Sequence, residues 1–209
     1  MIETNDIVSF IKKFHDAGWM PGSVGAVAQL IVHNESSKKI LVTPDKLDVN
    51  TLTTSDFFTL RDLYGTQEVQ APVRGNTTIS RWASSLFYLL GKNDARCIAF
   101  LPTKNACLLG RKSLELWHKQ GGHPNQLRLS HWGLLRDLGC TADTAIPIID
   151  SEGENALSQI EHIYELYVQP FPAILVRNYG VFSWEGSLPL LKNKLELLER
   201  LFELQLNLV

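Results

Sequence analysis

The most constraining feature of the sequence is a short apolar run at residues 173–176, followed by polar residues and a second apolar segment. A run of this length, made of aliphatic residues, is typical of a buried strand. Arg177, Asn178 and Gly180 then predict a tight turn, and residues 181–184 predict a second short strand. The chain is therefore expected to build a sheet with a buried interior.

Hydrophobic periodicity elsewhere predicts one α/β domain over residues 1–209, with short loops and no linker or repeat. The strongest helical pattern is at residues 187–206, where leucines recur on one face and charged residues on the other. An apolar run at residues 96–101 predicts a central strand buried on both faces. The other predicted helices run from Asn5 or Asp6 to Gly18 and over 79–90 and 155–167, and the other predicted strands over 24–33, 39–42, 57–63 and 145–149.

Length, charge and cysteine content exclude several classes of protein. At 209 residues and 44% hydrophobic composition, the chain is long enough for one well-filled core. A net charge of −2 gives no electrostatic reason to expect a nucleic acid or an anionic membrane as partner. No apolar run approaches the roughly 20 residues that span a bilayer, and the N-terminus has no signal-peptide pattern, so a cytoplasmic protein is expected. Cys97, Cys107 and Cys140 form no C-x-x-C pair, which favours reduced thiols.

The segment Arg177-Asn178-Tyr179-Gly180-Val181, with Trp184, resembles the R-N-H-G-V-x-x-W signature of the class II aldolase/adducin family. Further fragments in the same order extend the resemblance over most of the chain, and Gly18-Trp19-Met20-Pro21 is similar to the opening of the methylthioribulose-1-phosphate dehydratase branch. The resemblance implies a three-layer α/β/α fold around a central sheet that is largely antiparallel or mixed.

The resemblance also implies a chemistry. In the family, three histidines hold a divalent metal, usually zinc, which polarises a carbonyl or enediolate oxygen while a nearby carboxylate moves protons. In the dehydratase branch the result is loss of water from methylthioribulose 1-phosphate, a step of methionine salvage. Family members form cyclic tetramers with active sites between subunits, so a homo-oligomer, possibly a tetramer, or a hetero-oligomer with an active homologue is expected.

The positions that match the family's metal ligands carry other residues here. The H-x-H pair matches Phe100 and Pro102, which have no donor atom, and the third histidine matches Tyr179, whose phenol is a poor ligand near neutral pH. The catalytic glutamate matches Gly133. A buried carboxylate without its metal would cost several kcal/mol, so its loss together with the ligands is consistent. No zinc is expected, and the chain is predicted to be a pseudoenzyme that acts as a binding or scaffold protein.

Two alternatives stay open. The first is an active dehydratase or aldolase whose metal site is rebuilt from His118, His123 and His131; the two glycines between the first two of these predict a loop, and their spacing does not place them on one helical face. The second is a metal-free binder of a small ligand in the remaining cleft. Its candidate contacts are Arg74, Lys104, Arg136 and His131.

Overall fold

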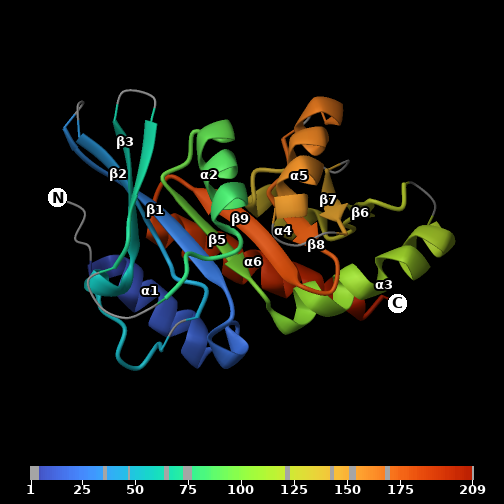
Figure 1. The fold of residues 1–209 in the computed structure, drawn as a ribbon. Coiled ribbons are helices and arrows are strands. Elements are labelled where there is room, and N and C mark those ends of the chain that lie inside the picture. The colour runs from blue at the N-terminus through green and yellow to red at the C-terminus, as the bar shows by residue number, and fades with distance from the viewer. Residues whose placement is uncertain are drawn as a thin grey trace.

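The structure, a computed structural model, describes residues 5–34, 37–46, 48–63, 66–72, 77–120, 123–141, 144–150, 154–167 and 170–208. Its centre is a nine-stranded sheet in the order β4-β3-β2-β1-β5-β9-β8-β7-β6 (Figure 1). Neighbouring strands are antiparallel except for β7 and β8, which are parallel. The strands are β1 (Ala26–Asn34), β2 (Ser37–Val42), β3 (Phe58–Leu63), β4 (Thr66–Gln70), β5 (Cys97–Leu101), β6 (Gln126–Arg128), β7 (Ala145–Ile149), β8 (Ala173–Val176) and β9 (Gly180–Glu185).

Helices cover both faces of this sheet, as the three-layer prediction requires. The α-helices are α1 (Asn5–Asp16), α2 (Ala83–Lys92), α3 (Lys104–Gln120), α4 (Trp132–Asp137), α5 (Glu154–Leu166) and α6 (Leu188–Leu206), and two short 3₁₀ helices lie at Pro21–Ser23 and Thr54–Asp56. Helices α2 and α5 pack on one face, and α1, α3, α4 and α6 pack on the other. In Figure 1, α2 and α5 stand above the sheet, while α1 and α3 lie below it. The predicted α/β/α fold with a mixed, mainly antiparallel sheet is confirmed.

Strand β5 shows why the sheet needs both helical layers. All five of its residues are buried. Ile98 and Phe100 pack in the cluster beneath α2 and α5, whereas Cys97, Ala99 and Leu101 pack in the cluster against α1 and α6. Successive side chains of a strand point to opposite faces, so an uninterrupted apolar run requires cover on both sides.

The two terminal helices follow the sequence pattern closely. The predicted apolar face of α1 is buried, and the helix ends where Gly18 adopts a positive φ of 74°. Helix α6 begins after Ser187, whose side chain accepts a hydrogen bond from the backbone N–H of Leu190 at 3.4 Å. The leucines at 191, 195, 198 and 201 are all buried.

Several local predictions differ from the structure. The helix expected from residue 79 begins only at Ala83, because Ile79 forms an isolated β-bridge with Pro44. Helix α3 was not predicted; it carries His118, and the loop predicted at Gly121 and Gly122 lies outside the described residues. Strands β4 and β6 and helix α4, all of six residues or fewer, were also not predicted.

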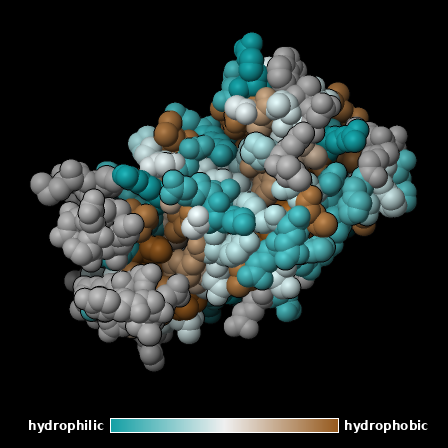
Figure 2. All heavy atoms as spheres, turned by 90° about the horizontal axis from the view of Figure 1, so that it is seen from above, coloured by the Kyte–Doolittle hydropathy of each residue, from teal (hydrophilic) through white to brown (hydrophobic). Residues whose placement is uncertain are grey.

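The outer surface is mixed in character. Seen from above, hydrophobic residues appear in several separate groups among hydrophilic ones (Figure 2). Within the described part of the chain, no helix combines the length and the apolar composition needed to cross a bilayer.

Candidate functional site

The turn between β8 and β9 is held tightly against the end of β5. Asn178 has a φ of 66°, and the backbone N–H of Tyr179 donates to the carbonyl of Val176 at 3.0 Å. Gly180 has a φ of 150°, and a Cβ added there would lie 2.9 Å from the Cα of Pro102. Only glycine fits this position, because a side chain would be both strained and obstructed. The close approach places Tyr179 and Pro102 at the same end of the sheet.

An aromatic cluster, formed by Trp82, Phe100, Tyr179 and Phe182, fills the space beside this turn. The ring of Trp82 lies 4.1 Å from Phe100, 5.4 Å from Phe182 and 6.4 Å from Tyr179, measured between centroids. Phe100 and Phe182 face each other across β5 and β9, with centroids 4.8 Å apart. Three of the rings are buried, and Tyr179 is 40% exposed.

The structure therefore brings together Phe100, Pro102 and Tyr179, the three residues that match metal-ligand positions of the family that the sequence resembles. Phe100 and Tyr179 share Trp82 as a neighbour, and Pro102 contacts the glycine that follows Tyr179. Their side chains do not fit a zinc ion, because phenylalanine and proline offer no donor atom and zinc in proteins takes sulfur, imidazole or carboxylate ligands. No three His, Cys, Asp or Glu side chains among the described residues are grouped so as to hold a metal ion.

Gly133 lies on α4, away from the aromatic cluster's face of the sheet. Leu135 of the same helix packs in the core between α3, α6 and the sheet, on the face opposite Phe100. Gly133 is exposed, and a Cβ added there would meet no atom within 4 Å. A carboxylate at this position would be solvated in this chain. Relief of a buried charge therefore does not explain the glycine, which corrects the energetic argument made from the sequence.

The three histidines of the rebuilt-site alternative make separate contacts. His118 packs on Trp117 with ring centroids 4.5 Å apart. The Nδ1 atom of His123 accepts a hydrogen bond from the backbone N–H of Asn125 at 3.2 Å. His131 is half-buried just before α4, and its Nε2 atom is buried without a hydrogen-bond partner in the described part of the chain.

The candidate ligand contacts from the sequence are dispersed. Lys104 is the exposed first residue of α3, and Arg136 is an exposed residue of α4 that lies 3.6 Å from Asp137. Neither of these two, nor His131, lines the two cavities described below. Arg74 lies outside the described residues. A role for any of them in ligand binding stays a prediction.

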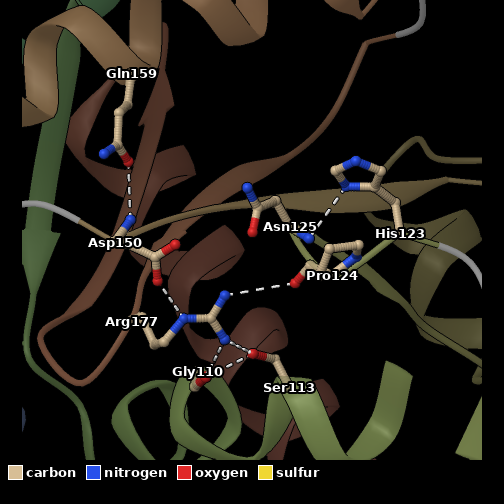
Figure 3. Close-up of polar contacts among 8 residues, drawn as sticks. All are labelled: Gly110, Ser113, His123, Pro124, Asn125, Asp150, Gln159 and Arg177. Atoms are coloured by element: carbon tan, nitrogen blue, oxygen red, sulfur yellow. Dashed lines mark hydrogen bonds and ion pairs between the residues drawn. The ribbon is translucent and has the colours of Figure 1, made fainter. Parts of the chain in front are cut away.

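Arg177 is the centre of a polar network that the sequence did not reveal. Its side chain is 12% exposed and forms an ion pair with Asp150 at the end of β7. One terminal nitrogen donates to the carbonyl of Gly110, at 3.2 Å, and to the hydroxyl of Ser113 on α3. The other donates to the carbonyl of Pro124 at 3.4 Å (Figure 3). The guanidinium thus joins α3, β7, β8 and the segment before β6, so its role is to position these elements.

Two neighbouring cavities lie along α5. The first has a volume of about 760 Å³ and is lined by residues of β6, β7 and α5. The second, of about 670 Å³, is lined by aromatic side chains of α5, β9 and the segment before β8, together with Lys194. Sequence reasoning missed both because their linings come from segments that only the sheet order brings together.

Burial shifts several titratable groups near these elements. It raises the pKa of Glu199 on α6, although the hydroxyl of Thr103 donates to this carboxyl group at 2.5 Å and opposes the shift. Burial also raises the pKa of the Cys97 thiol to about 12. The pKa values of Cys107 and Cys140 are raised for the same reason, so all three thiols are less nucleophilic than a free cysteine.

Comparison with known proteins gives consistent matches over nearly the whole chain. Residues 5–206 match the profile of the family described as class II aldolase and adducin N-terminal domain. A Caenorhabditis elegans protein, named a probable methylthioribulose-1-phosphate dehydratase, is 24% identical over 208 residues, which cover 94% of this chain and 73% of that protein.

Two solved structures share the fold. YgbL from Klebsiella pneumoniae has a TM-score of 0.71 at 17% identity, covering 98% of this chain and 88% of its own. L-fuculose-1-phosphate aldolase from Thermus thermophilus has a TM-score of 0.62 at 16% identity, covering 96% and 91%.

Proposed function

The chain belongs to the class II aldolase and adducin family, and from this membership we propose that it is a catalytically inactive relative of methylthioribulose-1-phosphate dehydratase. In this proposal the chain keeps the family fold and acts as a binding or scaffold protein. The alternative is an active enzyme of the same family. It needs metal ligands other than the residues at the family ligand positions, Phe100, Pro102 and Tyr179.

One observation carries the proposal. Phe100 and Tyr179, which match two family ligand positions, both pack on the ring of Trp82, and the first of them is buried among aromatic side chains. A zinc ion needs three protein donors and an open position for substrate in order to polarise a carbonyl oxygen. A phenylalanine without a donor atom and a tyrosine whose phenol is a poor ligand, both packed on Trp82, support loss of that chemistry rather than a shift of the site by a few residues.

The proposal is tested by metal content and turnover together. The protein is purified without a His tag and its zinc, iron and manganese are measured by elemental analysis. The same sample is then assayed for dehydration of methylthioribulose 1-phosphate, with the Caenorhabditis elegans relative assayed beside it. We expect well under one metal ion per chain and no turnover by folded protein. About one metal ion per chain, with turnover that a chelator abolishes, would refute the proposal.

We also propose that the protein assembles with itself or with an intact homologue in the cytoplasm. The exposed apolar side chains of Leu108 and Leu114 on α3, and of Leu190 on α6, are consistent with contacts to another chain. Light scattering of the purified protein measures the mass in solution. A monomer that stays a monomer when an active homologue is added would contradict this part of the proposal.

A further inference from the structure

The cavity of about 760 Å³ has an apolar floor and a polar rim. Ile149 of β7, whose side chain packs on the α5 face of the sheet, lines it from below, and Ile163 and Leu166 line it from α5. Its volume lies within the range typical of small-molecule sites, which are mostly apolar clefts with a few polar groups that fix the orientation of the ligand.

The polar rim consists of a carboxylate, which accepts hydrogen bonds, and of amide and phenol groups, which both donate and accept them. Asp150 at the end of β7, Gln159 on α5 and Asn125 before β6 lie around one space (Figure 3). Gln126 and Tyr167 line the same cavity. Amide groups both donate and accept, and a phenol does the same, so this rim matches a ligand that carries several hydroxyl groups.

The charges at the cavity balance locally. Asp150 is the acidic group among the described lining residues, and it forms an ion pair with Arg177. The guanidinium of Arg177 otherwise bonds to α3 and to the carbonyl of Pro124. No lysine or arginine stands among the described residues that line the cavity, whose basic side chains are the imidazoles of His123 and His162. A phosphorylated ligand would therefore lose its hydration without gaining an ammonium or a guanidinium group, which is unfavourable.

We propose that this cavity binds an uncharged sugar, a monosaccharide or disaccharide, in the space between α5 and β7. The apolar floor packs against the C–H face of the sugar ring, and the amide, carboxylate and phenol groups bind its hydroxyl edge. The site is lined by none of the four aromatic residues of the cluster at Trp82, so it does not depend on whether the chain has lost its metal chemistry.

The proposal is tested with matched neutral and phosphorylated probes at pH 8. D-ribose, D-glucose and maltose are compared with ribose 5-phosphate, glucose 6-phosphate and maltose 1-phosphate by saturation-transfer NMR and by ¹H–¹⁵N shift mapping of the protein. We expect at least one neutral sugar to bind. The affinity of the protein for the matching sugar phosphate should be lower by a factor of about ten or more. Shifts are expected at residues 145–150 and 158–167.

A blocking variant locates the site. Ser158→Trp introduces a large side chain from an exposed position of α5 that lines the cavity, and should abolish the signal. Ser84→Trp, the matched control at an exposed position of α2 that lines neither cavity, should leave binding unchanged. Circular dichroism confirms that both variants fold, and the shift map of the unmodified protein locates the site even if one does not. The proposal is overturned if none of the six probes binds, if the phosphates bind as tightly as the neutral sugars or more tightly, or if Ser158→Trp binds as the control does.

Discussion

Replacing Trp82 by alanine tests whether the aromatic cluster is a packed part of the core. Trp82 is 4% exposed, and its ring touches Phe100 and Phe182 at centroid distances of 4.1 and 5.4 Å. An aromatic side chain of this kind buries about 150–250 Å², which at about 25 cal/mol per Å² corresponds to about 4–6 kcal/mol as an upper bound. Truncations of buried aromatic residues cost about 3–5 kcal/mol. We therefore expect a loss of about 3–5 kcal/mol in the free energy of unfolding.

The assay is urea unfolding followed by circular dichroism, with a thermal scan on the same samples. For a chain of this length, about 3–5 kcal/mol corresponds to a fall of very roughly 6–20 °C in Tm. Leu208→Ala is the control, because this residue is 59% exposed just after α6 and should change stability by less than about 0.5 kcal/mol. A cost below about 1 kcal/mol for Trp82→Ala would refute the reasoning, since the ring would then fill no essential space.

Four further predictions concern single residues outside that cluster. Gly180→Ala should destabilise the fold by more than about 2 kcal/mol in urea unfolding, because its Cβ would lie 2.9 Å from the Cα of Pro102. Arg177→Met should cost about 2–4 kcal/mol in the same assay, because several polar partners lose a charged donor. Burial raises the pKa of Glu199 in the folded state above the ordinary carboxyl pKa. The stability linked to this group is therefore fully present below the ordinary pKa and is lost as the pH rises through the raised pKa of the folded state. Unfolding at pH 4.5 and 7.5 should therefore show wild type losing stability relative to Glu199→Gln at the higher pH; the opposite slope would contradict the burial argument. Cys97, with a thiol pKa of about 12, should resist iodoacetamide at pH 8 in the folded protein and react in urea, as read by mass spectrometry of the peptides.

Much of the sheet could be predicted because its strands have unambiguous patterns. The run at Cys97–Leu101 is apolar at every position, which specifies burial on both faces without any knowledge of neighbours. The pair Ala173–Val176 and Gly180–Glu185 was also correct, because Asn178 and Gly180, which both adopt a positive φ, mark the turn. Local sequence was sufficient where burial and backbone conformation are encoded by adjacent residues.

Helix α3 could not be predicted with the same rules. Gly110 weakens its helical pattern, and the reason for a glycine there is tertiary: an added Cβ would lie 3.3 Å from the Cα of Arg177. The aromatic cluster and the cavity beside α5 were missed for a related reason. Trp82 meets Phe100 and Phe182 only through the pairing of β5 with β9 and the placement of α2 over both. The sequence marked the family ligand positions but carried no sign of the residue that packs on them.

The proposed loss of metal chemistry would be hard to reverse by single substitutions. A histidine at position 100 would place a polar ring between Trp82 and Phe182 in a site that is 1% exposed. An unpaired buried donor or acceptor costs about 1–3 kcal/mol, and one imidazole alone gains no metal because the other two positions still lack ligands. Each step back toward a metal site would therefore lower stability before any catalysis returned. The present packing is self-consistent, since each ring of the cluster packs on at least one other ring of the cluster.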